Sequence, residues 1–306
     1  MSAAETFSDL MKVSVLGAGA GGGLPQWNCG CRNCVDARNG KIPPTTQSSV
    51  AVSVDGVEWV VLNASPDIRT QLQAAPEMHP PTVRGTPISS VVLTNADIDH
   101  IAGLLTLREK TAFTVFATHE THNVLAANSV FGVLDSDLVT RAEIRLDEAF
   151  EPLPGLSVTP FAVPGKVALF LEGADVDLKA MGEQTIGLRI SDGESVLYFI
   201  PGCAEVPDWL LTRLGDADML LFDGTVWEND EMQQTGTGEK TGARMGHVAM
   251  SGEQGSLARL SGLTDCRKIF IHINNTNPVW QPDSPERAAV EQAHWAIAQD
   301  TMSFQP

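Results

Sequence analysis

Three cysteines lie within six residues, in the pattern Cys29-x-Cys31-x-x-Cys34. Thiolates at this density bind Zn²⁺ tetrahedrally, and such sites hold loops together. The chain has five cysteines, an odd number with three clustered, which is unlike a disulfide framework. We therefore predict structural zinc at this cluster, in preference to unrelated thiols or a redox motif. The fourth ligand has no candidate nearby, so it comes from elsewhere in the fold or is a water molecule.

A second group of metal-binding side chains follows an apolar run at residues 89–93. Asp97, Asp99 and His100 place two carboxylates and an imidazole within four residues, close enough to converge on one cation. The alternative is a helix N-terminus at which Asp97 or Asp99 acts as the cap. On this stretch alone, the two interpretations are equally supported.

Three residues farther along the chain favour a metal pocket. His272 and Asp223 each follow an apolar run, and His247 lies in a glycine-flanked loop. Binding and catalytic residues concentrate where strands open into loops. We therefore expect these three side chains to gather with the acidic and histidine residues of the 97–100 stretch.

The elements that must position these side chains are mostly strands. Short β-branched or apolar runs predict strands, and amphipathic segments predict helices. Strands are expected at residues 12–17, 47–54, 58–62, 89–93, 113–117, 156–163, 167–172, 185–190, 195–200, 219–222 and 268–273. Helices are expected at residues 66–75, 101–108, 253–260 and 285–298, with a long loop or lid at residues 228–244. This pattern favours two packed sheets with outer helices.

The chain is acidic and apolar enough to form a large core. Its 306 residues carry a formal net charge of −18, and 43% of them are hydrophobic. An acidic surface repels phosphate backbones, so we expect no nucleic-acid partner. We also expect no membrane association, because no apolar run approaches a membrane span, and residues 1–10 do not have the pattern of a secretory signal. We expect a cytoplasmic protein with a loose extension at residues 1–10 and a single domain at residues 11–306.

The motifs together resemble a known family. The strand, the Asn95-to-His100 stretch, the helix and the late strand ending in a histidine are similar to the metallo-β-lactamase fold. With the cysteine cluster and the stretches NASPDIR (63–69) and HINNTNP (272–278), the likeness is closer to the coenzyme PQQ synthesis protein B family, from Met11 onward. The resemblance implies an α/β fold, a metallo-β-lactamase-like αββα sandwich of two packed mixed sheets with outer helices.

The chain departs from the hydrolase motif of that fold, H-x-H-x-D-H. Asn95 and Asp97 stand where two histidines of the first metal site belong. Two further ligands of that site would fall near residues 164–165 and 201–202, which are Pro-Gly pairs. The resemblance thus implies that the first site is lost. The second site survives as Asp99, His100 and His272. Two histidines and one carboxylate, with open positions, suit non-haem Fe²⁺ and dioxygen chemistry.

The resemblance implies a role in making pyrroloquinoline quinone (PQQ) from a glutamate–tyrosine crosslinked precursor. The leading hypothesis is an enzyme that uses O₂ and Fe²⁺, or another divalent metal, to hydroxylate the tyrosine ring. Asp97 would be a further ligand or a nearby carboxylate, while His247 and Asp223 would do acid–base work or orient ligands. The alternatives are a mobile loop histidine for His247 and a turn cap for Asp223.

Four residues are candidates for binding this aromatic, amino-acid-derived substrate. Arg244 and Lys240 are basic residues on the expected lid and could pair with substrate carboxylates. Trp227 and Trp280 lie in loops beside the motifs and could stack on an aromatic ligand. The alternatives are solvated loop charges for the cations and core packing for the tryptophans.

Two other functions stay open at this point. A carrier that holds PQQ or its precursor and assists its transport would need the pocket but no redox turnover. A zinc-dependent hydrolase would cleave an ester, a lactone or a phosphodiester, and the missing first-site ligands count against it. The sequence does not fix the assembly, for which a homodimer is one candidate.

Overall fold

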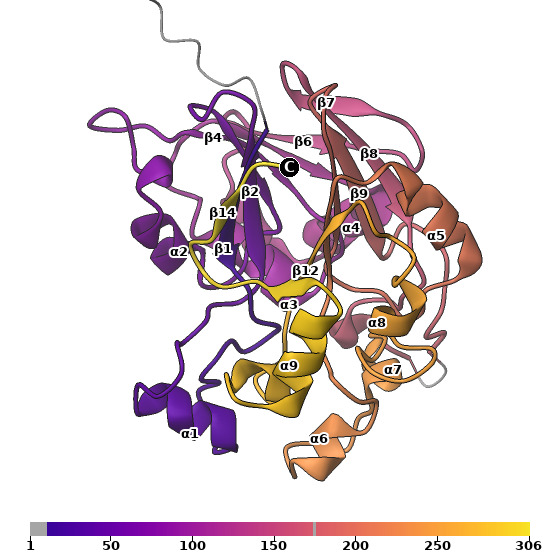
Figure 1. The fold of residues 1–306 in the computed structure, drawn as a ribbon. Coiled ribbons are helices and arrows are strands. Elements are labelled where there is room, and N and C mark those ends of the chain that lie inside the picture. The colour runs from indigo at the N-terminus through magenta and orange to yellow at the C-terminus, as the bar shows by residue number, and fades with distance from the viewer. Residues whose placement is uncertain (1–10, 174–175) are drawn as a thin grey trace, which may run out of the picture.

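The β-branched and apolar runs assemble into two mixed sheets of seven strands each (Figure 1). The computed structural model describes residues 11–173 and 176–306, so the extension predicted at residues 1–10 lies outside the described residues. The first sheet has the order β14-β1-β2-β3-β4-β5-β6, and the second has the order β13-β12-β11-β10-β9-β8-β7. The organisation of residues 11–306 as one domain stays a prediction.

Each sheet combines antiparallel and parallel pairs. The first sheet contains β1 (Lys12–Gly17), β2 (Ser49–Ser53), β3 (Trp59–Leu62), β4 (Ile88–Val92), β5 (Phe113–Ala117), β6 (Val139–Glu143) and β14 (Ser303–Phe304). The second contains β7 (Phe150–Leu153), β8 (Leu156–Ala162), β9 (Ile186–Ser191), β10 (Val196–Ile200), β11 (Met219–Asp223), β12 (Arg267–Ile271) and β13 (Trp295–Ile297). Neighbours from β3 to β6 and from β10 to β13 are parallel, and the other pairs are antiparallel.

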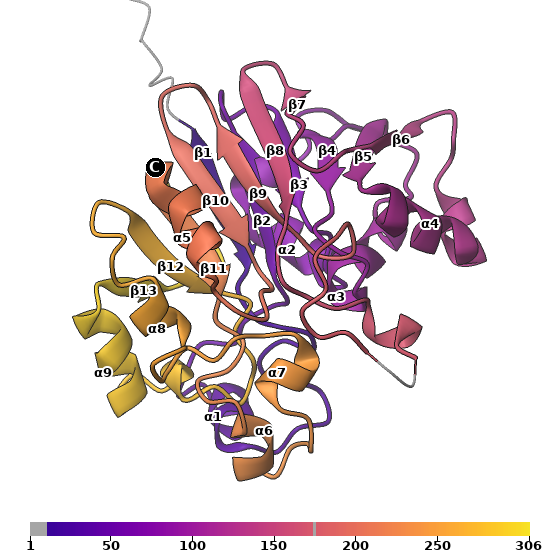
Figure 2. The ribbon, with the colours of Figure 1, turned by 90° about the vertical axis from the view of Figure 1, so that its right-hand side faces the viewer.

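Helices cover the outer sides and one end of the paired sheets. They are α1 (Arg32–Arg38), α2 (Ile68–Ala74), α3 (Ile98–Ile101), α4 (His119–Ala127), α5 (Asp208–Arg213), α6 (Glu231–Gln234), α7 (Gly242–Met245), α8 (Ser256–Arg259) and α9 (Pro285–Gln292). In Figure 1, α2 and α5 lie on opposite sides of the sheets, and Figure 2 shows α1, α6, α7 and α9 at the same end. Within the described ranges, no helix combines the length and the apolar character that crossing a membrane requires.

The residues of β3 show how the first sheet is buried on both faces. Val60 and Leu62 belong to the core shared by the two sheets, whereas Trp59 and Val61 pack with residues of α2 and α4. Successive side chains of a strand point to opposite faces, so alternate residues of one strand serve two cores. The expected sandwich of two packed mixed sheets with outer helices is therefore confirmed.

Two expected elements are wrong. Residues 167–172 do not form a strand; they contain a 3₁₀ turn, η4 (Leu169–Leu171), whose side chains are exposed. The helix expected at residues 285–298 ends at Gln292, because His294 adopts a left-handed conformation (φ 60°) and the chain then forms β13. Short apolar runs do not distinguish a strand from other apolar segments, and periodicity does not show where a helix stops. The expected lid at residues 228–244 contains the short helices α6 and α7.

The parallel strands direct the chain toward one site from both sheets. In the first sheet, β4 leads into the stretch that carries Asp99 and His100. In the second sheet, β11 ends at Asp223, and β12 is followed at once by His272. Side chains at the carboxyl ends of these strands therefore meet where the two sheets adjoin.

Candidate metal sites

Asp99, His100 and His272 lie together, although 172 residues separate the two histidines in the sequence. Asp99 Oδ2 lies 3.0 Å from His272 Nε2 and 3.9 Å from His100 Nε2. The two imidazole rings meet edge to face, with centroids 5.4 Å apart. One carboxylate oxygen and two ring nitrogens therefore face a common point, as metal donors do.

The other ring nitrogen of each histidine is held by a neutral oxygen. His100 Nδ1 lies 2.7 Å from Asn95 Oδ1, and His272 Nδ1 lies 2.9 Å from Thr225 Oγ1. An amide oxygen only accepts, so His100 Nδ1 donates and its Nε2 carries the free lone pair. That Nε2 atom is buried and has no hydrogen-bond partner among the described residues. A buried, unpartnered acceptor beside a carboxylate fits a divalent cation.

The charges at this centre also suit a cation. Burial opposes ionisation of Asp99, but His100 and His272 hold the pKa of its carboxyl below the usual range. Burial lowers the pKa of His100, which keeps its imidazole neutral and able to bind a metal. For His272, burial acts in the opposite direction to the Asp99 hydrogen bond, and the bond prevails and raises its pKa.

The centre opens into a cavity of about 280 Å³. Asp97 and His247 line this cavity, together with Lys166 and Lys240. Asp97 occupies the N-cap position of α3, but its side chain makes no capping hydrogen bond. Its carboxylate instead accepts from Asn95 Nδ2 (3.2 Å) and from the Leu169 amide (3.2 Å). Asp97 thus joins the metal-binding stretch to the η4 turn.

One of the two positions where the resemblance implies missing first-site ligands is closed by a neighbouring side chain. A Cβ at Gly165 would lie 2.6 Å from the side chain of Thr185, so no larger residue fits there. A Cβ at Gly202 would lie 3.5 Å from His247 Cε1, an ordinary contact distance, so the His247 ring lies next to this position without closing it. Two sets of one carboxylate and two histidines share His272 at this end of the cavity: Asp99, His100 and His272, and Asp223, His247 and His272. In the second set, His247 Nδ1 already pairs with Asp223 Oδ2.

Asp223 and His247 form a second, connected pair beside this centre. His247 Nδ1 lies 2.8 Å from Asp223 Oδ2, and the His247 ring stacks on that of His272 at 5.2 Å. Asp223 is fully buried and also accepts from the amides of Cys203 (2.9 Å) and Thr225 (3.0 Å). Asp223 therefore fixes the His247 ring from behind, while His247 faces the cavity.

The predicted substrate-binding residues lie in different places. Arg244 pairs with Glu172 at 2.6 Å, and Lys166 binds the other oxygen of Glu172 at 2.9 Å. The hydrogen bond from Arg244, with help from Lys166, lowers the pKa of Glu172 to about 2. Lys240 lines the cavity, as does Lys166, which the sequence did not single out. A lone lysine in an apolar segment has no sequence pattern from which its place at a cavity could be predicted.

The two tryptophans are not among the residues that line the cavity in the described chain. Trp280 is buried, and its Nε1 donates to the Asn274 carbonyl at 2.8 Å. Trp227 is half-buried and packs against the core between the sheets. In this conformation both occupy packing positions, which was the alternative to aromatic stacking.

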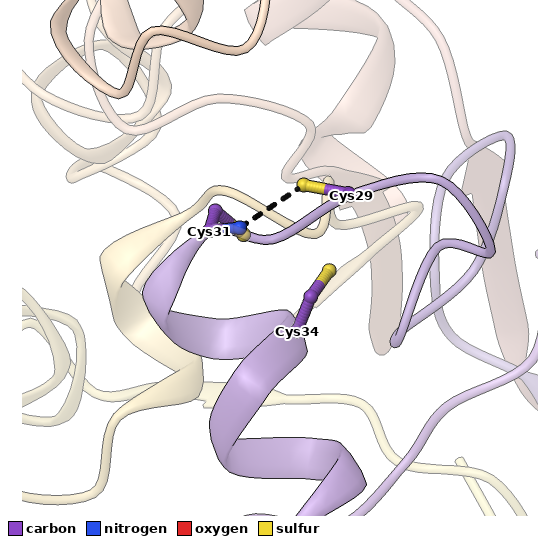
Figure 3. A group of neighbouring side chains, drawn as sticks. All are labelled: Cys29, Cys31 and Cys34. Atoms are coloured by element: carbon purple, nitrogen blue, oxygen red, sulfur yellow. Dashed lines mark hydrogen bonds between the residues drawn. The ribbon is translucent and has the colours of Figure 1, made fainter.

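The three clustered cysteines form the other candidate metal site. Figure 3 shows Cys34 projecting from α1, with Cys29 and Cys31 in the loop that leads into it. The donor sulfurs lie within 4.8 Å of one another, and the Cys31 amide donates to Cys29 Sγ at 3.4 Å. Burial raises the pKa of Cys31 to about 12, whereas for Cys29 burial is outweighed by hydrogen bonds, from the Cys31 amide first, which lower its pKa. A cation would let all three thiols ionise together.

The comparisons with known proteins agree with this geometry. A family model for the beta-lactamase superfamily domain matches residues 58–273. A coenzyme PQQ synthesis protein B from Ruegeria pomeroyi is 58% identical and covers 96% of this chain and 99% of its own length. One from Rhizobium meliloti is 55% identical, covering 96% of this chain and 97% of its own length.

Solved structures confirm the expected metallo-β-lactamase fold. Zn²⁺-bound PqqB from Methylobacterium extorquens has a TM-score of 0.95 and 52% identity to this chain, covering 96% of this chain and all of its own. A diphosphatase from the PhnP family has a TM-score of 0.69 at 20% identity, covering 97% of both chains, which indicates a shared fold alone.

Proposed function

This chain belongs to the coenzyme PQQ synthesis protein B family, within the β-lactamase superfamily, and on that premise we propose that it takes part in PQQ biosynthesis. More finely, we propose that it hydroxylates the tyrosine ring of a glutamate–tyrosine crosslinked precursor. The observation that carries this proposal is the donor set of Asp99, His100 and His272, whose His100 Nε2 is buried and unpartnered among the described residues, beside the closed position at Gly165.

Two imidazoles and a carboxylate with open positions suit non-haem Fe²⁺, which when bound supplies the activation of O₂. A dinuclear hydrolytic centre needs separate ligands for its second metal. At Gly165 there is no space for a side chain that could provide one. The other donor set, Asp223, His247 and His272, shares His272 with the first, and its Asp223 already accepts hydrogen bonds from two backbone amides. The net reaction places one oxygen atom on the ring. The other leaves as water, with two electrons and two protons from an external reductant.

The residues of the cavity would bind and orient the precursor. Lys240 supplies positive charge at the cavity of an otherwise acidic chain, which suits a carboxylate of an amino-acid-derived substrate. Lys166 also lines the cavity, but its ammonium already pairs with Glu172. His247 would accept the phenol proton through Nε2, because Asp223 already holds its Nδ1. Asp97 would keep the η4 turn against the metal-binding stretch.

For the cysteine cluster, we propose structural Zn²⁺. The Methylobacterium extorquens relative is Zn²⁺-bound, and three thiols converge here on one point. Thiolates prefer zinc, whereas the nitrogen and oxygen donors of the cavity suit iron. The two sites therefore differ in donor type, and this difference would direct zinc to the cysteine cluster and iron to the cavity.

The test is a single-turnover reaction. The zinc-loaded protein is reconstituted with Fe²⁺ without oxygen, mixed with a glutamate–tyrosine crosslinked peptide and an external two-electron reductant, and exposed to O₂. Mass spectrometry should show the gain of one oxygen atom on the tyrosine. Tight binding of PQQ with no oxygenated product would instead support a carrier, and ester cleavage with zinc would support a hydrolase.

A pair of histidine variants checks the metal assignment. His272→Ala removes one of three donors, so we expect it to abolish Fe²⁺ binding and product formation, as measured by metal analysis after desalting. His119→Ala is the matched control, because His119 is exposed on α4 and, among the described residues, its ring pairs only with Glu143. Full iron retention by His272→Ala would refute the ligand assignment.

A further inference from the structure

One side chain from a distant segment reaches all three sulfurs of the cysteine cluster. The terminal amide nitrogen of Asn275 lies 3.2 Å from Cys29 Sγ, 3.5 Å from Cys31 Sγ and 3.3 Å from Cys34 Sγ. Asn275 lies 241 residues from Cys34 in the sequence, in the turn that follows β12. Near-equal distances to three converging donors mark the remaining vertex of a tetrahedron.

The distances agree with zinc geometry. With Zn–S bonds of about 2.3 Å, a Zn–O bond of about 2.1 Å and tetrahedral angles, a fourth ligand atom lies about 3.6 Å from each sulfur. The amide tip of Asn275 already lies close to that separation from all three sulfurs. The shift that zinc would require is a few tenths of an ångström.

The amide can present either of its two terminal atoms. Toward thiols without a metal, the NH₂ group donates, as it does here. Asn275 Oδ1 accepts no hydrogen bond among the described residues, so a half-turn of the amide breaks no other contact in that part of the chain. The oxygen and nitrogen of an asparagine amide are nearly equal in shape, and the oxygen is the atom with lone pairs to donate.

The backbone of Asn275 is held in place by an amide side chain from α1, in addition to a contact of its carbonyl with Cys31 Sγ at 3.8 Å. Asn33, on α1, donates through Nδ2 to the carbonyls of Asn275 and Asn277, both at 2.9 Å. Asn33 Oδ1 accepts in turn from Gln281 Nε2 at 2.8 Å. The two hydrogen bonds that Asn33 donates are buried, and the one that it accepts is half-buried. The side chain of Asn275 is therefore aimed at the cluster before any metal arrives.

We propose that Asn275 is the fourth ligand of the zinc site, through Oδ1. This closes the coordination shell as three thiolates and one neutral oxygen, with no position left for water. A closed shell is typical of a structural zinc, whereas a catalytic zinc keeps an open position. The proposal stands apart from the hydroxylase reaction, because it concerns the other metal site and is measured without substrate.

Three substitutions separate a ligand from a hydrogen-bond donor. Asn275→Asp keeps an oxygen at the vertex but cannot donate to thiolates, so a ligand role predicts zinc affinity within about threefold of the unchanged protein. Asn275→Ala removes the oxygen and should weaken zinc binding about tenfold or more. Asn275→Cys should add a fourth sulfur to the zinc X-ray absorption spectrum. Affinity is measured by competition with a chromophoric chelator.

Asn28→Ala is the matched control, because Asn28 precedes Cys29 in the loop that carries the thiols, is exposed, and within the described residues its side chain hydrogen-bonds only to Gln26. It should bind zinc like the unchanged protein. The proposal is overturned if Asn275→Asp loses as much affinity as Asn275→Ala, which is the result for a donor. It is also overturned if Asn275→Cys still shows three sulfurs. Cobalt substitution of the purified variants, read from the thiolate absorption bands, reports the same count where zinc spectra are weak.

Discussion

At the residue scale, the histidines of the active-site centre are set by uncharged partners. Asn95 Oδ1 fixes the Nδ1 proton of His100, and the Thr225 hydroxyl does the same for His272. The resemblance to the metallo-β-lactamase fold implies a metal-binding histidine at the position of Asn95, and in this chain Asn95 instead holds the His100 ring. Such outer partners commonly change metal affinity by about 10–100-fold when removed.

We therefore predict that Asn95→Ala weakens Fe²⁺ binding by about 10–100-fold, because the His100 ring loses the acceptor that fixes its tautomer. Anaerobic titration with a metal indicator measures this. Asn95→Asp keeps an acceptor at the same place and should retain most of the affinity. Equal affinities for the alanine variant and the unchanged chain would show that Asn95 has no orienting role.

The residue patterns identified the candidate metal donors but not their hydrogen-bond partners. Asp99, His100 and His272 were found because their types suit metals and because each follows an apolar run. Asn95 and Thr225 have types that occur in any turn, and their roles depend on contacts across the fold. Asn275 was part of a recognised motif, yet its approach to sulfurs more than 240 residues away has no local signal.

At the element scale, the short helix α6 is anchored by its first residue. Glu231 is buried and accepts from the Trp227 amide at 2.6 Å and from Thr276 Oγ1 at 2.5 Å. The second contact joins the lid to the turn after β12. Burial raises the pKa of Glu231 to about 7, from the ordinary value of 4.5.

This pKa gives the lid anchor a defined pH dependence. The folded chain binds the Glu231 proton more tightly than the unfolded chain does, so the stabilisation is complete below about pH 4.5 and is lost as the pH rises through about 7. From pH 5 to pH 8, the unfolding free energy of the unchanged protein should fall by roughly 1–3 kcal/mol more than that of Glu231→Gln. Urea unfolding of the zinc-loaded proteins measures it. Parallel pH profiles for the two proteins would contradict the assignment.

Helices and strands could be predicted where a repeated apolar or β-branched pattern runs along the whole element. They could not be predicted where a single residue or a distant contact determines whether the element forms or where it ends. The strands at residues 49–53, 59–62 and 88–92 follow their β-branched runs. The run at 167–172 is equally apolar, but within the described residues it pairs with no strand. Leu169 lines the cavity, and its backbone amide donates to the Asp97 carboxylate instead. The last helix stops because His294 turns left-handed, a choice that periodicity does not reveal.

At the scale of the whole molecule, the cysteine cluster fastens α1 and its loop to the second sheet. The loop before α1 contributes the thiols, and the turn after β12 contributes Asn275 and, three residues earlier, His272. Backbone contacts through Asn33 reinforce the same junction. Zinc would therefore stabilise a contact between segments at opposite ends of the chain.

Removal of this zinc should lower the thermal midpoint by roughly 5–10 °C, because a ligand that binds only the folded state adds its binding free energy to stability. Scanning calorimetry with and without a zinc chelator measures the shift. Cys34→Ser is the control: it should start from the lower midpoint and respond little to the chelator. A chelator that removes zinc without moving the midpoint would rule out a structural role.

The turn at residues 272–277 has a consequence for how the cell supplies this protein with metals. It carries one donor for each metal site: His272 and, as proposed, Asn275. An ion that fixes one of these donors would therefore also restrict the backbone of the other, three residues away. Linkage is reciprocal: whatever factor zinc adds to the affinity for iron, iron adds to the affinity for zinc. A cell starved of zinc would then deplete this chain of iron as well, and restoring either metal would help recover the other.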